Sequence, residues 1–235
     1  ILRLVSADRV MVVRVMTEFK HVVVYGDSLS WGIIPLTRRR LDFASRWPQV
    51  MARDLNDTAE AAGRDYRVHV TEECLNGRRT AFEDPYKPGR SGLIGIQQVI
   101  EAQSPLDVVI IMLGTNDFQS IHRHTPWHSA MGIAAIIDAI RATTLEPEIP
   151  VPKILVVAPP ALDHPRGPIG PKFTGGDTAS AGLADALRQI TAEYGCGFFD
   201  ANSVITSSTV DGVHLDKEQH RVLGKAVSKV VAQLL

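Results

Sequence analysis

The 235-residue sequence contains only two cysteines, Cys74 and Cys196, which are too few for a disulfide framework. It also has no Cys-x-x-Cys pair of the kind that holds zinc or carries out redox chemistry. Nothing in this cysteine usage requires an oxidising compartment. A cytoplasmic location is therefore the default expectation.

The sequence has no excess of charge of either sign. Its 25 basic and 26 acidic residues give a formal net charge of −1, so no global field attracts nucleic acid or an anionic membrane surface. Only Arg38, Arg39 and Arg40 form a dense basic run. A solvated loop is the favoured interpretation of this run, and a place near the mouth of a substrate site is the alternative. We expect no nucleic-acid partner.

The sequence also lacks a clean apolar run long enough to cross a membrane. Its apolar N-terminal segment is interrupted by charged residues, namely Arg3, Asp8, Arg9 and Arg14. It therefore lacks the hydrophobic core of a signal peptide or a membrane helix, and we expect no membrane association. A natural start at Met16 precedes the first strand signal. We interpret residues 1–15 as an upstream extension and residues 16–235 as a single domain.

Short apolar runs alternate with helical patterns along the rest of the chain. Runs rich in β-branched residues predict strands at residues 21–25, 66–71, 107–113, 154–158 and 197–199. Helical spacing and start signals such as Pro48 and Pro126 predict helices at residues 47–55, 93–102, 126–143 and 177–194, with a last helix after Asp216. Residues 73–92 and 163–176 are rich in glycine and proline, which predicts two long loops.

Five strands alternating with helices predict an α/β fold. We expect a three-layer α/β/α flavodoxin-like sandwich with a five-stranded parallel sheet in the order 2-1-3-4-5. Ser28 follows the first strand, Gly77 the second and Asn116 the third, while Asp211 and His214 follow the fifth. These positions are at the carboxyl ends of strands, where such sheets bind ligands. Because the first strand lies between the second and the third, we expect Ser28, Gly77 and Asn116 to be spatial neighbours.

Ser28, Asp211 and His214 supply the three residue types that nucleophilic acyl transfer needs. A serine hydroxyl is inert until a base takes its proton, and a carboxylate orients that base. His214 comes three residues after Asp211, so one short turn can carry both residues. Asp211 can then accept a hydrogen bond from His214 Nδ1, and His214 Nε2 can face Ser28. Taken singly, each residue can also be a helix cap or part of a surface turn. His220 is the rival base, but its position within the last helix predicts that it is exposed.

Two further residues are candidates for stabilising an oxyanion. Asn116 can donate from its side-chain amide, or it can be a turn residue that tolerates the left-handed conformation. Gly77 can present its backbone N–H to a substrate, or it can belong to an Asn-Gly turn. Removing one oxyanion donor typically costs about 3 kcal/mol of transition-state stabilisation.

Substrate-binding candidates lie beside these residues. Asp27 and Asn76 adjoin Ser28 and Gly77 in sequence, and Trp31 can line an apolar acyl or alcohol pocket, with anchoring in the core or a loop equally open. The histidines at 122, 124 and 128 match no strong metal motif and have no interleaved carboxylate. We expect no metal and no other cofactor.

In four ordered blocks the sequence resembles the SGNH (GDSL) hydrolases. The blocks are residues 26–29 (GDSL), Gly77, residues 114–117 (GTND) and residues 211–214 (DGVH). The family signature takes Ser, Gly, Asn and His, one from each block. Residues 30–32, 107–117 and 211–214 look like the bacterial arylesterase and acyltransferase branch. The second block reads Asn-Gly-Arg-Arg where Ser-Gly-Asp is commoner.

This resemblance implies a metal-free serine esterase that acts on small acyl esters. In it Ser28 is the nucleophile, His214 the base and Asp211 its partner. The Ser28 N–H, the Gly77 N–H and the Asn116 side chain form the oxyanion hole. The resemblance also implies acyl transfer to alcohols and assembly into a homo-oligomer, including octamers, whose subunits narrow the active-site channel.

Two other functions stay open at this point. One is deacetylation of carbohydrate esters. The other is a non-catalytic flavodoxin-like binding module whose serine loop holds phosphate or flavin, although no Gly-x-Gly-x-x-Gly or Walker-type loop follows the first strand. An α/β-hydrolase is less favoured, because its nucleophile elbow is Gly-x-Ser-x-Gly and residue 30 is serine.

Overall fold

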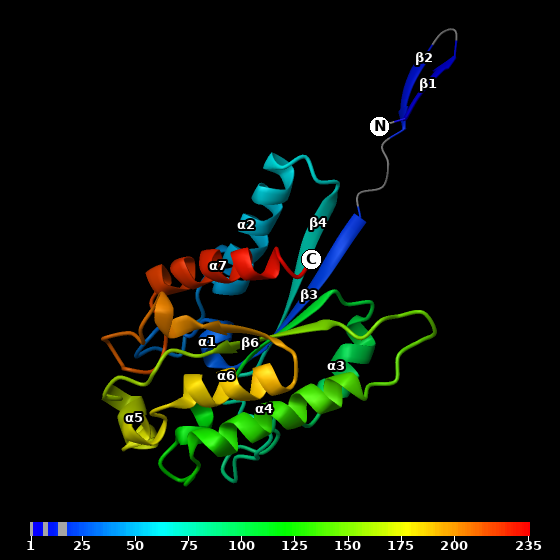
Figure 1. The fold of residues 1–235 in the computed structure, drawn as a ribbon. Coiled ribbons are helices and arrows are strands. Elements are labelled where there is room, and N and C mark those ends of the chain that lie inside the picture. Colours follow the sequence, from blue (N-terminus) through cyan, green and yellow to red (C-terminus); the bar gives the residue numbers. More distant parts are fainter. Residues whose placement is uncertain (1, 7–8, 14–17) are drawn as a thin grey trace.

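A five-stranded parallel sheet forms the centre of the molecule (Figure 1). The computed structural model describes residues 2–6, 9–13 and 18–235. The strands are β3 (Glu18–Gly26), β4 (Tyr66–Cys74), β5 (Val108–Met112), β6 (Lys153–Ala158) and β7 (Gly197–Asp200). They lie side by side in the order β4-β3-β5-β6-β7. This confirms the predicted α/β fold and its 2-1-3-4-5 order.

Two layers of helices enclose the sheet (Figure 1). Helices α3 (Ile96–Gln103), α4 (Pro126–Arg141) and α6 (Leu183–Glu193) pack into one buried cluster with the sheet, and α2 (Trp47–Ala61) and α7 (Lys217–Val231) pack into the other. No helix in the described part of the chain is long and apolar enough to cross a membrane.

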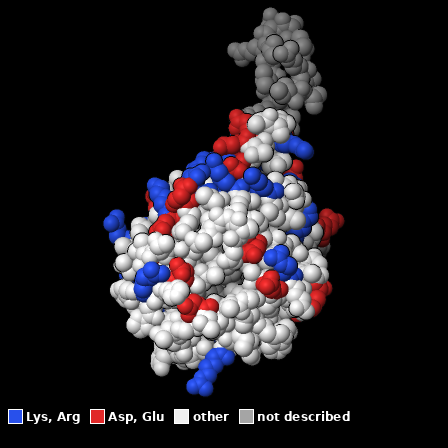
Figure 2. Space-filling view, turned by 60° about the vertical axis from the view of Figure 1, so that its left-hand side comes forward, with Lys and Arg blue, Asp and Glu red and all other residues white. Residues whose placement is uncertain are grey.

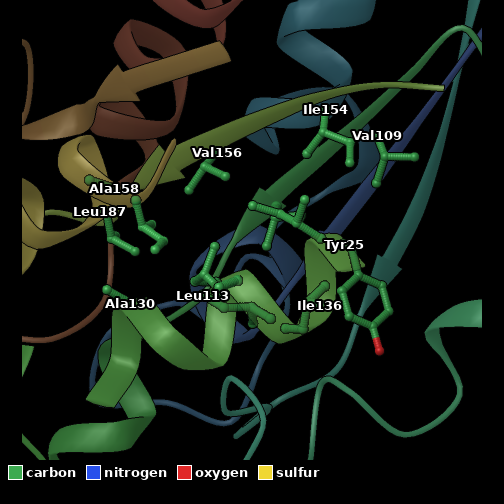
Figure 3. Close-up of a cluster of buried hydrophobic side chains, with 14 of the residues drawn as sticks. Tyr25, Val109, Leu113, Ala130, Ile136, Ile154, Val156, Ala158 and Leu187 are labelled. Atoms are coloured by element: carbon green, nitrogen blue, oxygen red, sulfur yellow. The ribbon is translucent and has the colours of Figure 1, made fainter. Parts of the chain in front are cut away.

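The central strands divide their side chains between the two layers, because successive residues of a strand point to opposite faces. In β5, Val109 and Ile111 belong to the cluster with α3, α4 and α6, while Val108 and Ile110 belong to the cluster with α2 and α7. All four are completely buried. Figure 3 shows the first cluster, with Val109 and Leu113 over the helices that carry Ile136 and Leu187. Burial on both faces explains the unbroken apolar runs in the sequence.

The predicted N-terminal extension contains its own two-stranded antiparallel sheet. Strand β1 (Leu2–Ser6) pairs with β2 (Arg9–Val13), and neither joins the five-stranded sheet. Residues 1, 7–8 and 14–15 of the extension lie outside the described residues. Its interpretation as an extension of the domain stays a prediction.

The second long loop and the helix after it differ from the prediction. Residues 163–176 contain a 3-10 helix, η3 (Gly167–Phe173), and the helix expected over residues 177–194 is divided into α5 (Gly176–Ala179) and α6. The break falls at Gly182, whose φ of 87° lies in the left-handed region that glycine adopts freely.

The prediction that His220 is exposed is wrong. His220 lies on the buried side of α7, and its Nδ1 accepts a hydrogen bond of 3.1 Å from the backbone N–H of Trp47 at the start of α2. That N–H has no partner within its own helix, because the first turn of a helix leaves its donors free. Burial, and secondarily the charge of Arg46, lower the pKa of His220 to about 3. The imidazole therefore joins α7 to α2 in its neutral form.

The buried His220 predicts a loss of stability in acid. The unfolded chain takes up a proton near pH 6.5, whereas the folded protein resists protonation down to about pH 3. Stability is therefore complete above pH 6.5 and falls as the pH drops through the interval between these values. The fall from pH 6.5 to 5 corresponds to about 2 kcal/mol of unfolding free energy.

Between pH 6.5 and pH 5, we expect the unfolding free energy of His220→Asn to fall by about 2 kcal/mol less than that of the wild type. Asparagine keeps an acceptor for the Trp47 N–H and does not titrate. Urea unfolding at pH 6.5 and pH 5 measures the difference. An equal decline in both proteins would contradict this account.

Candidate active site

The loops that leave the carboxyl ends of the strands meet at one small pocket. Ser28 begins the short helix α1 (Ser28–Trp31) directly after β3, and Asn116 lies in the 3-10 helix η2 (Thr115–Phe118) after β5. Ser28, Gly77, Asn116 and His214 line this pocket, which has a volume of about 50 Å³. We call it the serine pocket. Residues from four distant parts of the sequence are thus neighbours.

Asp211 and His214 form a buried pair in the turn before α7. The His214 Nδ1 lies 2.7 Å from Asp211 Oδ2, and Asp211 Oδ1 accepts the backbone N–H groups of Val213 and His214, each at 2.9 Å. Burial alone would raise the pKa of Asp211, but these hydrogen bonds hold it below its ordinary value. The ionised carboxylate therefore orients the ring by accepting from Nδ1 and leaves Nε2 for another partner.

Gly212 is required by the shape of this turn. Its φ is 73°, and a Cβ atom at this position would lie 2.1 Å from the carbonyl oxygen of Asp163. Any side chain would force the turn away from the loop after β6, so the spacing between Asp211 and His214 depends on glycine.

Ser28 is nearly buried at the first position of α1, where Asp27 caps the helix by accepting the Leu29 N–H at 2.9 Å. Among the described residues no hydrogen bond joins Ser28 Oγ to His214, although both side chains line the serine pocket. Catalytic hydrogen bonds are often long without substrate and tighten when it binds.

A buried polar network lies beneath Ser28. Asn116 Nδ2 donates to Asp27 Oδ2 at 2.9 Å and to the Arg78 carbonyl oxygen at 3.1 Å, and Gln119 donates to Asn116 Oδ1 at 2.9 Å. Burial raises the pKa of Asp27 to about 6. Asp27 is 1% exposed and does not line the pocket. It supports the site from below and does not occupy the substrate-binding position that was predicted for it.

Arg78 holds the ends of two strands together beside this network. Its Nη1 donates to the carbonyl oxygens of Gly26, at 3.0 Å, and Glu73, which are in β3 and β4. The guanidinium lies 3.9 Å over the Tyr25 ring. The departure from Ser-Gly-Asp in the second block thus supplies an arginine that fixes the strand ends near Ser28.

Arg79 forms a buried ion pair with Asp117, with 3.3 Å between Arg79 Nε and Asp117 Oδ1. The Asp117 carboxylate also accepts the Thr80 N–H, the Thr80 hydroxyl and the Ser129 hydroxyl. Both charged side chains are almost completely removed from solvent. This pair anchors the loop that carries Gly77 to the end of β5.

Comparison with known proteins agrees with this arrangement. A profile of the GDSL-like lipase/acylhydrolase family matches residues 24–222. The chain belongs to this family. Its members are ester hydrolases, and the matched range includes Ser28, Gly77, Asn116 and the Asp211–His214 turn.

Solved structures extend the comparison. An aryl esterase from M. smegmatis in an inhibitor-bound form is 34% identical, with a TM-score of 0.83 over 92% of this chain and 100% of that one. Est24, a carbohydrate acetylesterase from Sinorhizobium meliloti, is 33% identical, with a TM-score of 0.84 over the same shares. Among curated proteins, none shows a significant sequence match.

The remaining substrate-binding predictions for this acylhydrolase have different outcomes. Asn76 lines the serine pocket beside Gly77. Trp31 lines neither the serine pocket nor the larger pocket described below. Arg40 stacks 4.7 Å over its ring, and Arg40 Nε donates to its carbonyl oxygen at 2.7 Å. Arg40 in turn pairs with Glu72 at 2.7 Å. Trp31 is therefore anchored at the end of α1 and is not a pocket wall.

Basic residues lie at the mouth of the site, and sequence reasoning missed two of them, Lys87 and Lys172. Arg38, Lys87 and Lys172 all line the serine pocket. Arg38 is exposed, as the solvated-loop interpretation expects, and it also lies at the mouth of the site, as the alternative expects. Lys87 and Lys172 lie in the regions predicted as long loops, which overhang the strand ends. Elsewhere, basic and acidic side chains are interspersed around a broad uncharged area on the face in Figure 2, as the balanced composition indicates.

A larger pocket of about 440 Å³ adjoins the serine pocket. We call it the outer pocket. Arg38, Ile169, Lys172 and His214 line both pockets. The boundary between the two is thus formed partly by the imidazole.

The histidines near η2 pack with one another and with Arg79. The rings of His122 and His124 stack at 5.9 Å, and His124 Nδ1 lies 2.7 Å from Arg79 Nη2. Partial burial, and secondarily Arg79, lower the pKa of both histidines. The described residues contain no group of three or more side chains placed to hold a metal ion.

The buried ion pair predicts a large cost for removing its negative charge. Asp117→Asn leaves the Arg79 guanidinium buried without a counter-ion, so we expect it to lower the unfolding free energy by about 3 kcal/mol. Urea unfolding measures this, with the exposed Asp138→Asn as a matched control that stays within about 0.5 kcal/mol of the wild type. Similar losses in the two variants would contradict the role of the pair.

Proposed function

We propose that this acylhydrolase is a serine esterase that cleaves small acyl esters, aryl esters among them, through an acyl-enzyme on Ser28. The observation that carries the proposal is the buried Asp211–His214 pair on the wall of the pocket that also contains Ser28. An oriented imidazole beside a serine hydroxyl is the arrangement that activates the nucleophile.

The reaction begins when Ser28 Oγ attacks the ester carbonyl and His214 Nε2 takes its proton. Asp211 keeps Nδ1 protonated and stabilises the imidazolium that forms. His214 then protonates the leaving alcohol, and an acyl group remains on Ser28. Water activated by the same imidazole releases the acid.

The tetrahedral oxyanion takes its donors from three loops. The Ser28 N–H belongs to the first turn of α1, Gly77 presents its N–H from a turn at φ 84°, and Asn116 presents its amide. Asn116 gives both of its N–H groups to protein acceptors, and the contact to the Arg78 carbonyl oxygen is the longer. We propose that the oxyanion competes for this second N–H.

Pocket size supports a short acyl group. The serine pocket, with a volume of about 50 Å³, is far smaller than the outer pocket, with about 440 Å³. An acetyl group is therefore the favoured acyl part. The outer pocket has room for the alcohol part and, after the acyl-enzyme forms, for an alcohol that replaces water as acceptor. Acyl transfer to alcohols is accordingly part of the proposal, as is assembly into a homo-oligomer.

Deacetylation of carbohydrates is the second candidate. It is favoured by the 33% identity to the acetylesterase Est24 over 92% of this chain. Comparing hydrolysis of acetylated sugars with that of aryl acetates separates the two specificities. A yellow protein or bound phosphate would instead favour the binding-module alternative.

The nucleophile prediction concerns p-nitrophenyl acetate. We expect Ser28→Ala and Asp211→Asn each to lower kcat about 10⁴-fold, because the first removes the attacking atom and the second the orientation of His214. Added short alcohol should divert acetyl groups to an acetyl ester in the wild type. Ser203→Ala is the control, since this serine is exposed and lies outside both pockets. Equal rates in the wild type and Ser28→Ala would overturn the proposal.

The oxyanion prediction separates kcat from stability. We expect Asn116→Ala to lower kcat for p-nitrophenyl acetate by about 10²- to 10³-fold with a much smaller change in KM, because the donor acts mainly in the transition state. Thermal unfolding is measured in parallel. A variant that is less stable but keeps kcat would show that Asn116 supports only the fold.

A further inference from the structure

Three cationic side chains gather around the serine pocket. Arg38, Lys87 and Lys172 line it; Arg38 and Lys87 come from two loops and Lys172 from the 3-10 helix η3. Lys87 lies close to the candidate oxyanion donor, since a Cβ atom on Gly77 would be 4.0 Å from Lys87 Nζ. A fourth cation, Arg90, donates to the Asn76 carbonyl oxygen at 3.1 Å beside Lys87, which donates to the same oxygen at 3.3 Å.

Arg38, Lys87 and Lys172 lack counter-ions of the kind that Arg40 and Arg79 have. Arg40 and Arg79 pair with Glu72 and Asp117. By contrast, no carboxylate oxygen among the described residues lies within 4.0 Å of a side-chain nitrogen of Arg38, Lys87 or Lys172.

The acidic residues near the mouth of the serine pocket already have hydrogen-bond partners within the protein. Within the described chain, Asp211 is the one acidic residue that lines either pocket, and it is bound to His214. Asp84 is the acidic residue that acts on both lysines, but it is buried and its Oδ1 accepts the N–H groups of Tyr86 and Lys87. Asp84 thus offsets only part of the positive charge of the two lysines, and within the described chain no carboxylate lies on the pocket walls beside Arg38, Lys87 and Lys172 except the one bound to His214.

The lysine pKa values agree with this charge distribution. Partial burial lowers the pKa of Lys87 and of Lys172, and the neighbouring cations Arg38 and Arg90 lower both further. A negatively charged group of a ligand would relieve the repulsion between these side chains.

The position of His214 indicates which part of a bound ester lies near Arg38 and Lys172. In the proposed reaction His214 protonates the leaving alcohol, so the alcohol lies on the histidine side. The outer pocket is on that side, and Ser28, Gly77 and Asn116 do not line it. Its walls combine the apolar side chains Leu36, Pro168 and Ile169 with Arg38 and Lys172.

We propose that the preferred substrates are short-chain acyl esters of alcohols or phenols that carry an anionic group, which Arg38 and Lys172 bind in the outer pocket. The apolar wall contacts the carbon skeleton of the alcohol part, and the cations contact its carboxylate or phosphate. This inference rests on the proposed esterase function and specifies its substrate class.

The test compares kcat/KM for 4-acetoxybenzoate with kcat/KM for the neutral 4-acetoxybenzamide. The ratio of the two is measured in the wild type, Arg38→Gln, Lys172→Gln and the control Arg39→Gln. Arg39 is the adjacent exposed arginine of the same basic run and lines neither pocket. Because the same two esters are used with every protein, the difference in their leaving-group reactivity contributes equally to each ratio and cancels when the proteins are compared. A parallel series with 4-acetoxyphenyl phosphate distinguishes phosphate from carboxylate recognition.

We expect each pocket substitution to lower the ratio about fivefold and Arg39→Gln to leave it unchanged, as for partly exposed charge contacts. In the wild type, the ratio should also fall several-fold when salt is raised to about 0.5 M, because salt screens the attraction between partly exposed charges. This second measurement needs no variant to fold.

The failures of the two proposals are distinguishable. If the wild type hydrolyses both esters and the ratio is the same in all four proteins and at both salt concentrations, the anionic-substrate proposal is wrong and the esterase proposal stands. If the wild type hydrolyses neither these esters nor p-nitrophenyl acetate, the esterase proposal is wrong, and the substrate class inferred from it is wrong too.

Discussion

The parallel register of the three neighbouring strands β4, β3 and β5 is the constraint on which the site depends. Gly26, the last residue of β3, is paired with both Cys74 and Met112, the last residues of β4 and β5. The three strands therefore end at the same level of the sheet. Their loops bring Ser28, Gly77 and Asn116 to the same pocket, although 88 positions separate the first from the last.

Polar groups buried at the carboxyl edge of the sheet need hydrogen-bond partners, because an unpaired buried polar group costs free energy. These hydrogen bonds make the edge rigid. Asn116 uses its whole amide on Asp27, Arg78 and Gln119. Arg79 and Asp117 pair where neither meets solvent. These interactions fix the positions of Ser28, Gly77 and Asn116 in the absence of a substrate, which is the condition for electrostatic stabilisation of a transition state in the proposed reaction. The cations Arg38, Lys87 and Lys172 at the mouth lie outside this network.

The sheet and the candidate catalytic residues were predictable because their signals are local. A β-branched run ending in glycine indicates a buried strand, and the residue after a parallel strand lies at the ligand-binding edge. This rule places Ser28 and Asn116 near that edge, and their side-chain chemistry together with the resemblance to the SGNH hydrolases made them candidates. Periodicity also located α2, α4 and α7, with errors mainly at their ends.

Other features depend on contacts between distant segments and carry no local signal. The burial of His220 depends on the start of α2, which is 173 positions away in the sequence. The sequence makes Trp31 a candidate pocket wall, whereas in the structure Arg40, nine positions away, stacks on its ring. Arg38 has the same local sequence pattern as Arg39, and only the loop fold directs one of them to the pocket. The division of the helix at residues 177–194 depends on Gly182, whose backbone conformation a periodic pattern does not reveal.

The most direct test of the account is peptide mass spectrometry after treatment with an aryl organophosphate. The account predicts one covalent phosphoryl adduct on Ser28 in the wild type and a much slower adduct in His214→Ala, because only the imidazole activates that hydroxyl. An adduct on another residue, or labelling of Ser28 at the same rate without His214, would contradict the claim that these two side chains act together.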